Sequence, residues 1–414
     1  MRGSLTAVLV CALFAPLLPA QNIPLSEYKT RRAALRKDLN GTVILFGKTV
    51  GNDEVFGFEQ EPNFYYLTGW TQPGAVLLVD KNNEILFLPH HNERMEIFTG
   101  RKTSAEDADA RQVTGFDKVL PIEKLESELD QALQGSERVY ALRGQPGTEK
   151  LKSYLAFREI SDAAPLIAKL RIKKSEAEIA AIQHATDISI KGHLAAWKRM
   201  QPGLYEYQIA ATMSDVFFEN GCESYAYSPI IGSGPNSTIL HYSSNRRRMD
   251  SGEVVVMDAA AECGHYASDI TRTVPVSGKF TSRQREIYEV VLGAQKAAIA
   301  AIKPGARMWG EDGSITKIAR DYINSHGQDS HGKPLGKYFT HGLGHPVGID
   351  VHDPMVNEPL EAGMVITVEP GIYIPEENIG VRIEDVVLVT ENGAKVMSAA
   401  LPKEPDQVEK ALAK

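Results

Sequence analysis

A mostly apolar run that ends on a carboxylate places the strongest constraint on how this chain folds. Residues 253–257 are apolar after the first position and rich in valine, which predicts a buried strand ending on Asp258. A short turn follows, and a second predicted strand, residues 266–276, carries Asp269. A charged side chain at the end of a buried strand costs free energy unless it is paired or bound to a metal. Two such carboxylates on neighbouring strands would repel each other, and a divalent cation between them would remove both costs.

Three further candidate ligands follow downstream. One aspartate at a strand end is usually a turn or capping residue, so the argument depends on the wider set. His345 lies four residues after His341, but the glycines between them argue against a helical zinc motif, and the glutamate of such a motif is absent. Glu369 ends another predicted strand, and Glu384 lies inside a predicted buried strand, residues 381–390.

These five side chains suit a centre with two divalent metal ions. Four carboxylates and one imidazole form a set rich in oxygen ligands, in which some carboxylates can bridge two ions. Mn²⁺ fits this set best, and Co²⁺ or Zn²⁺ is also acceptable. Two ions about 3.5–4 Å apart would hold a water molecule between them and lower its pKa, which produces hydroxide at neutral pH.

The length and charge of the chain indicate a soluble globular protein that does not bind nucleic acid. With 414 residues the chain is long enough for more than one domain. It carries 45 basic and 53 acidic residues, a net charge of −8, and 43% hydrophobic residues, as is typical of a soluble globular protein. Its one compact basic run, Arg246 to Arg248, predicts a solvated loop, so we expect no nucleic-acid partner.

The first twenty residues predict a secretory signal peptide. Arg2 precedes a nearly continuous apolar run that is short for a membrane span, and Ala20 completes a small-residue cleavage site. An uncleaved anchor is the alternative, disfavoured by two prolines in this region. We expect export to the periplasm or the medium, with no stable membrane association after cleavage. Cys222 and Cys263 would then remain; they could pair, but we expect two buried free thiols.

Patterning divides the rest of the chain in two. Strands and helices alternate over residues 24–165, with strands expected at 42–46 and 64–69, which predicts a small α/β domain. A linker is expected at 163–170. After it, Ser175 and Glu178 form a capping box that opens a long helix, and further helices are expected at 206–219, 282–302 and 315–325.

Taken together, the motifs resemble the pita-bread metallopeptidases, and among these most closely aminopeptidase P, also called Xaa-Pro aminopeptidase. The resemblance is carried by the segments MDAAAECGHYASDITRT, HGLGHPVGIDVHD, VEPGIY and GVRIED and by the N-terminal stretch FYYLTGWTQPGAVLLV. It spans nearly the whole mature chain. It implies an α+β protein with a C-terminal pita-bread catalytic domain, residues 171–405, preceded by a smaller α/β N-terminal domain. It also implies a homo-oligomer, either a dimer or a tetramer.

The resemblance implies a role for each metal ligand. Asp258 would chelate one ion, and Asp269 and Glu384 would bridge both. His345 and Glu369 would hold the second ion, and Glu369 would also shuttle the proton of the attacking hydroxide.

Further residues match family positions around the metals. His241 and His352 match the histidines that polarise the scissile carbonyl and stabilise the oxyanion. His341 matches a residue of the proline pocket, and Tyr227 is placed with it as a substrate-binding residue. The residues matching those that orient the metal carboxylates are Tyr227, Tyr373 and Arg382.

The resemblance implies release of the N-terminal residue from peptides with proline in second position. A bond to proline is a tertiary amide without an N–H, and metal-assisted attack needs no such hydrogen bond from the substrate. A prolidase restricted to Xaa-Pro dipeptides is the alternative; a metal-free binding protein or a creatinase-type hydrolase is disfavoured because all five ligands are present. The chain departs from its relatives at Asn63, where many have an acidic residue that approaches a neighbouring subunit's active site.

Overall fold

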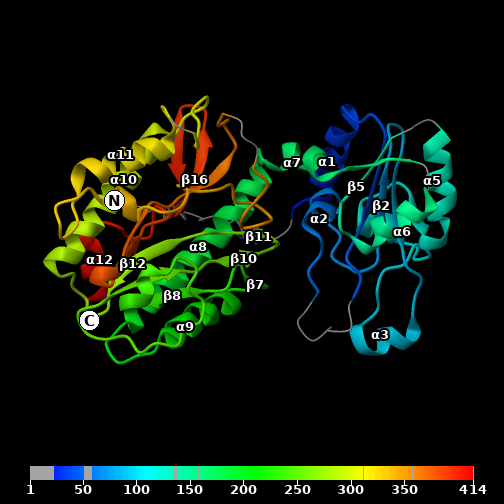
Figure 1. The fold of residues 1–414 in the computed structure, drawn as a ribbon. Helices are drawn as coiled ribbons and strands as arrows, with labels where there is room; N and C mark the ends of the chain where they lie inside the picture. The colour runs from blue at the N-terminus through cyan, green and yellow to red at the C-terminus, as the bar shows by residue number, and fades with distance from the viewer. Residues whose placement is uncertain are drawn as a thin grey trace, which may run out of the picture.

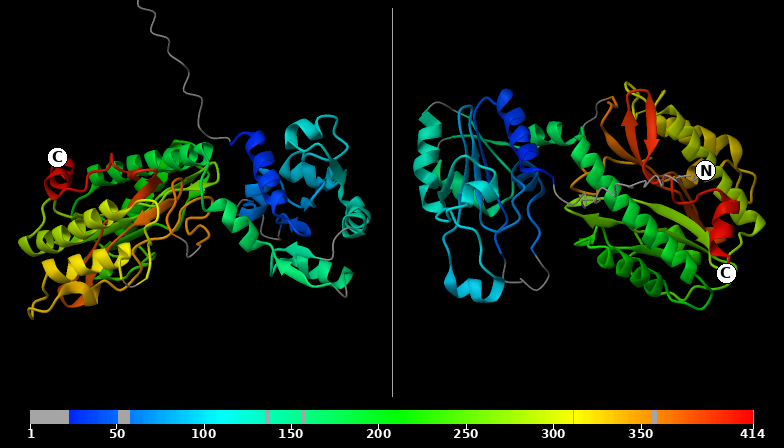
Figure 2. Two further views of the ribbon diagram at one scale, coloured as in Figure 1. Left: turned by 90° about the horizontal axis from the view of Figure 1, so that it is seen from above. Right: turned by 180° about the vertical axis from the view of Figure 1, so that it is seen from behind.

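The computed structural model of the chain describes residues 23–50, 58–134, 138–155, 158–310, 312–355 and 359–413. They form two lobes, a smaller N-terminal domain and a larger C-terminal domain, which are seen from three directions in Figures 1 and 2. The predicted signal peptide, residues 1–20, lies outside the described residues. Among the helices of the described part, none has the length and apolar character needed to span a bilayer.

The N-terminal domain is built on a mixed six-stranded sheet with helices on both faces. Its strand order is β4-β3-β2-β1-β5-β6. Successive residues of β1 (Thr42–Phe46) point to opposite faces and are apolar on both, so each face needs a cover. Val43 and Leu45 pack in one cluster with α1 and α2, and Ile44 packs in another with α5 and α6. The remaining elements of this domain are β2 (Val76–Val79), β3 (Glu84–Leu88), β4 (Val119–Pro121), β5 (Val139–Ala141), β6 (Ile160–Asp162), α1 (Leu25–Lys37), α2 (Pro62–Thr68), α3 (Glu93–Thr99), α4 (Ala110–Thr114), α5 (Leu125–Gln134) and α6 (Pro146–Tyr154).

One expectation for this half of the chain is wrong, and another is refined. Of residues 64–69, expected as a strand, all but the last belong to helix α2, which has Pro62 in its first turn and is capped by Gly69 in the left-handed conformation, φ 66°. The aromatic residues that suggested a strand are all buried. Hydrophobicity along this segment therefore shows neither the period of a strand nor that of a helix. The expected linker is itself a helix, α7 (Ala164–Arg171), which lies between the two domains in Figure 1.

The C-terminal domain has strands between two pairs of helices (Figure 1). Helices α8 (Glu176–Arg199) and α9 (Glu206–Glu219) pack on each other, and so do α10 (Ser282–Ala301) and α11 (Ile315–His326). The predicted capping box of α8 is confirmed, because the Ser175 side chain accepts from the Glu178 amide at 3.3 Å and the Glu178 side chain accepts from the Ser175 amide at 3.1 Å. The other elements are β7 (Ser224–Tyr225), β8 (Ile230–Ser233), β9 (Val254–Asp258), β10 (Ala261–Cys263), β11 (Tyr266–Ala267), β12 (Thr271–Pro275), β13 (Val365–Val368), β14 (Gly371–Ile374), β15 (Ile379–Arg382), β16 (Asp385–Thr390), β17 (Gly393–Val396) and α12 (Pro405–Leu412).

Two predicted long strands are each divided in the structure. The strand expected at 266–276 is split into β11 and β12, with Asp269 between them, and the strand expected at 381–390 is split into β15 and β16, with Glu384 between them. The reason is a change of partner. β15 pairs with β14 and β16 with β13, and β11 pairs with β10 and β12 with β9. Each carboxylate therefore lies where the chain passes from one sheet to another, not inside a strand.

The two cysteines of the C-terminal domain form a disulfide. Cys222, just after α9, is bonded to Cys263 of β10, and their Cα atoms are 4.3 Å apart. The expectation of two free thiols is therefore wrong. Sequence alone could not decide this, because pairing depends on β10 lying beside the end of α9, a contact 41 residues distant in the chain.

Candidate metal centre and active-site cavity

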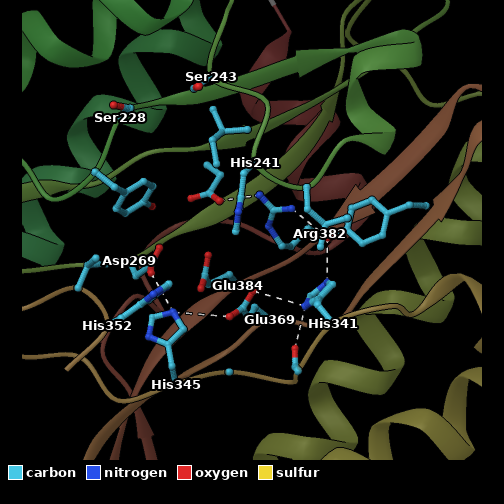
Figure 3. A pocket seen from close by; sticks show the side chains of 18 residues that line it. Ser228, His241, Ser243, Asp269, His341, His345, His352, Glu369, Arg382 and Glu384 are labelled. Atoms are coloured by element: carbon cyan, nitrogen blue, oxygen red, sulfur yellow. Dashed lines mark hydrogen bonds and ion pairs between the residues drawn. The ribbon is translucent and has the colours of Figure 1, made fainter. Parts of the chain in front are cut away.

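One cavity of about 490 Å³ gathers all the residues that the sequence singled out (Figure 3). It lies in the C-terminal domain and is lined by carboxylates, imidazoles and two aromatic hydroxyls. The singled-out residues among its lining are Tyr227, Asp258, Asp269, His241, His341, His345, His352, Glu369, Tyr373, Arg382 and Glu384.

Strand ends deliver the carboxylates to this cavity. Asp258 is the last residue of β9, and Thr271 of β12 lies opposite it in the antiparallel pair. Glu369 directly follows β13. The backbone N–H of Glu384 donates to the carbonyl of Thr271 at 3.0 Å, which joins the break between β15 and β16 to the start of β12. The sheets thus bring acidic residues more than a hundred positions apart into contact.

Burial and mutual repulsion disfavour the charged forms of these acids. Burial raises the pKa of Glu384 well above its usual range, and the charges of Asp269 and Glu369 add to the effect. Burial likewise raises the pKa of Asp258 and brings that of Glu369 to about 7. A cation among these groups would reverse the balance, because it favours the ionised carboxylates.

His345 completes the acidic group. Its Nε2 lies 3.3 Å from Asp269 Oδ2 and 3.6 Å from Glu369 Oε1. Burial opposes a charge on the ring, but the hydrogen bond and charge of Asp269, with the charge of Glu369, outweigh it and raise the pKa of His345 to about 9. Its Nδ1 lies 3.0 Å from the Pro346 carbonyl, which leaves Nε2 facing the carboxylates.

The donor set fits divalent cations. One ligand atom each from Asp269, His345 and Glu384 lie within 4.8 Å of one another, close enough to share an ion. Asp258 Oδ1 is buried and has no hydrogen-bond partner among the described residues, so one acceptor that faces the cavity is unsatisfied. Oxygen donors with one imidazole nitrogen are what divalent ions of intermediate hardness accept.

Arg382, Tyr373 and Thr271 hold the carboxylates in place. Arg382 donates from Nη2 to Asp258 Oδ2 at 2.5 Å, from Nη1 to Tyr373 Oη at 2.9 Å and from Nε to Thr271 Oγ1 at 3.1 Å. Thr271 Oγ1 in turn donates to Glu384 Oε2 at 2.7 Å. The chain of contacts fixes the orientation of two acids, Asp258 and Glu384.

The remaining histidines border the acidic group. Burial lowers the pKa of His341 to about 4, and its Nε2 lies 2.9 Å from Tyr373 Oη. The ring of His352 packs edge-on against His345, with ring centroids 4.1 Å apart, and burial lowers its pKa. His241 reaches into the cavity from the segment after β8 (Figure 3). The neutral imidazoles of His341 and His352 can offer hydrogen bonds to a polar ligand without adding charge.

Tyr227 lies against the acids rather than in open space. Burial raises the pKa of its hydroxyl well above the usual range, and the charges of Asp258 and Asp269 act in the same direction. The group therefore stays protonated and keeps a hydroxyl that faces the carboxylates.

Sequence reasoning missed residues that support this cavity from outside. Thr271 was read only as part of a strand. Glu206 is fully buried at the start of α9; its Oε2 accepts from Tyr242 Oη at 2.9 Å, and its Oε1 accepts from the Ser233 amide at 2.8 Å. Tyr242 directly follows His241, so Glu206 fixes the backbone that carries this histidine. A lone glutamate in the first turn of a helix is usually exposed, so no local signal marks it.

Replacing Thr271 with valine tests the supporting contacts. The change keeps the shape of the side chain but removes its hydrogen bonds to Glu384 and Arg382. We expect affinity for divalent metal, measured by isothermal titration calorimetry, to fall roughly 10- to 100-fold. Thr148→Val is the matched control, because Thr148 is equally buried but donates to the Leu142 carbonyl in the N-terminal domain. Equal affinities in the two variants would contradict the assignment.

Comparisons with known proteins agree with this geometry. Residues 180–391 match the model of metallopeptidase family M24, and residues 28–140 match that of the aminopeptidase P N-terminal domain. A Xaa-Pro aminopeptidase of Haemophilus influenzae is 35% identical, with 94% of this chain and 97% of the relative covered. A Xaa-Pro dipeptidase of Pyrococcus furiosus is 37% identical, with 83% and 92% covered.

A solved structure shows the same fold. Aminopeptidase P from Escherichia coli with the inhibitor Pro-Leu superposes with a TM-score of 0.83 at 30% identity, covering 94% of this chain and 98% of that one. The resemblance seen in the sequence and the expected α+β architecture are thus confirmed. The chain belongs to metallopeptidase family M24 and carries the N-terminal domain of aminopeptidase P in front of its catalytic domain.

Proposed function

We propose that this protein is a metal-dependent Xaa-Pro aminopeptidase, which releases the N-terminal residue from peptides with proline in second position. The observation that carries the proposal is the convergence of four carboxylates and His345 in one cavity that also contains three further histidines. The similarity to Xaa-Pro aminopeptidases over nearly the whole chain supports the substrate class. A dipeptidase is the second candidate, because the Pyrococcus furiosus relative carries that name.

The proposed ion ligands are Asp258, Asp269, His345, Glu369 and Glu384, and we propose Mn²⁺ as the native ion because oxygen donors dominate this set. When bound, two divalent ions supply positive charge that polarises the scissile carbonyl and makes a water molecule acidic.

The side chains of the protein then position the substrate and move the proton. Glu369 accepts a proton from the attacking water and passes it to the departing proline nitrogen, which must be protonated to leave. His241 and His352 donate hydrogen bonds to the carbonyl oxygen as negative charge develops on it. His341, held neutral beside Tyr373, forms part of the wall that receives the proline ring. None of these contacts requires an N–H at the scissile bond, which proline lacks.

Matched tripeptides test the reaction. With Mn²⁺ present, we expect release of the first residue from an Xaa-Pro-Xaa peptide and little or none from the same peptide with alanine in place of proline, measured by mass spectrometry of the products. An Xaa-Pro dipeptide assayed beside them distinguishes the alternatives. Cleavage of the dipeptide alone would overturn the aminopeptidase assignment in favour of a prolidase.

Glu369→Gln is the control that ties the activity to this cavity. The amide keeps the size of the side chain but cannot carry the proton, so kcat should fall at least about 100-fold, the lower range of general acid–base contributions. Chelation should abolish wild-type activity and added Mn²⁺ should restore it. If the chelated protein and Glu369→Gln both kept the turnover of the untreated wild type, the result would point to a metal-free function of the same fold.

We also propose that the protein is exported. The composition of its first twenty residues supports this, and so does the Cys222–Cys263 disulfide, because structural disulfides persist mainly in oxidising compartments. Fractionation of cells that express the full chain should place it in the periplasm or the medium, with a new N-terminus at Gln21 or a near neighbour. A cytosolic protein with an intact N-terminus would contradict the proposal.

We further propose a homo-oligomer, either a dimer or a tetramer. Ile97 and Phe98 of α3 are 82% and 76% exposed, and adjacent apolar side chains on a surface often mark a contact between proteins. Light scattering should give a mass of two or four chains, and a mass of one chain would contradict the proposal.

A further inference from the structure

A buried arginine at the end of the interdomain helix reaches the loop that carries His352. Arg171, the last residue of α7, is only 2% exposed. Its Nη2 donates to Asp353 Oδ1 at 2.6 Å and to Asp350 Oδ2 at 2.7 Å. A charged group this deeply buried is retained only at a cost, so its contacts need an explanation beyond general stability.

The same arginine is anchored in the N-terminal domain. Its Nη1 donates to Asn63 Oδ1 of α2 at 2.9 Å. Tyr66, also on α2, donates from its hydroxyl to the Leu170 carbonyl at 3.0 Å, which braces the end of α7. Asn63 therefore points toward Arg171. The neutral amide oxygen of Asn63 accepts a hydrogen bond from Arg171 without adding a third carboxylate to Asp350 and Asp353.

Asp353 connects Arg171 to the loop of residues 346–353. Its side chain is 1% exposed and also accepts from Lys174 Nζ at 3.0 Å, while its backbone N–H donates to the Pro346 carbonyl at 3.0 Å. The Asp350 amide lies 3.3 Å from Asp353 Oδ1. The carboxylate thus closes residues 346–353 into a compact loop.

The two histidines of this region are held in different ways. The backbone of His345 is tied to β13, because its N–H donates to Thr367 Oγ1 at 3.0 Å and its carbonyl accepts from the Thr367 N–H at 2.8 Å. For the ring of His352, the described part of the chain provides the edge-on contact with His345 and no hydrogen bond. Its place in the cavity therefore depends on the backbone immediately before Asp353.

We propose that Arg171 is a positioning residue for His352, and that through Arg171 and Asn63 the N-terminal domain sets the geometry of the active-site loop. The inference deepens the proposed function and rests on it for the role of His352. The metal ligands and His352 are then held in place by different contacts. The strands hold the metal ligands, whereas the salt bridge between the interdomain helix and Asp353 holds the histidine that would contact the substrate carbonyl.

Arg171→Ala tests this in full-length protein loaded with Mn²⁺. We expect kcat for an Xaa-Pro-Xaa peptide to fall about 10- to 100-fold, the size of effect that a misplacement of about 1 Å produces. KM and the dissociation constant for Mn²⁺ should stay within about threefold, because the ligand-bearing strands are untouched. Arg171→Lys keeps the charge but not the two-pronged geometry, and should recover part of kcat. Asn63→Ala, which removes only one of the contacts made by Arg171, should cause a smaller loss.

Arg32→Ala is the matched control. Arg32 is 1% exposed in the N-terminal domain, where Nη2 contacts Glu84 at 3.2 Å and Nη1 donates to the Leu67 carbonyl at 2.9 Å, so its loss should also destabilise the fold. It should leave kcat of the folded enzyme unchanged. A similar fall in kcat for both variants would reduce Arg171 to a general structural role and overturn the proposal.

Hydrogen exchange of the metal-free protein gives a readout that does not depend on activity. In Arg171→Ala, the amides of residues 347–353 should exchange faster than in the wild type, while those of β13 should not change. Unchanged exchange in the loop, or a loss of Mn²⁺ affinity greater than tenfold, would overturn the proposal. If the wild type cleaves no Xaa-Pro peptide, the proposed function fails, yet the exchange experiment still decides whether Arg171 holds this loop.

Discussion

The close approach of four buried acids is the physical constraint on which the rest of this structure depends. Carboxylates that share a buried site raise one another's pKa, and here burial and neighbouring charge act together on Glu384, Asp258 and Glu369. Such an arrangement is unfavourable in isolation. It is understandable as a binding site for cations, whose charge converts repulsion into attraction.

The fold holds these acids rigidly in place. Three of the acids lie just at or beyond strand ends, at Asp258, Glu369 and Glu384, where backbone pairing limits their movement. Arg382 lies behind them and neutralises part of their charge without occupying the space between them. The helices pack outside these strands and cover their apolar outer surfaces (Figure 1). Rigid placement suits metal ligands, since coordination tolerates little variation in distance.

The histidines that would contact the substrate are placed differently. His241 and His352 lie on connecting segments, and each is followed by a residue that forms a buried polar contact, Tyr242 with Glu206 and Asp353 with Arg171. Buried charges thus fix loops that no strand pairing supports. Because Arg171 belongs to the interdomain helix, the position of His352 is coupled to the packing of the two domains.

The sequence predicted the long helices of the C-terminal domain and eleven of the eighteen residues that line its cavity. The acids could be found because each lies beside an apolar strand, whereas most of the other residues were found through the family resemblance. The sequence did not predict the breaks at Asp269 and Glu384, since a change of strand partner leaves no mark on local hydrophobicity. It assigned α2 as a strand, because an aromatic run buried on every side has no period. It also missed the disulfide, Glu206 and Arg171, whose partners lie far away in the chain and are recognisable only once the fold is known.

Anomalous diffraction at the manganese edge, from crystals grown with Mn²⁺, is the most direct test of the central claim. The account predicts two anomalous peaks in this cavity, held by side chains from the set Asp258, Asp269, His345, Glu369 and Glu384. A cavity without anomalous signal under saturating Mn²⁺, or ions bound only by other residues, would contradict it.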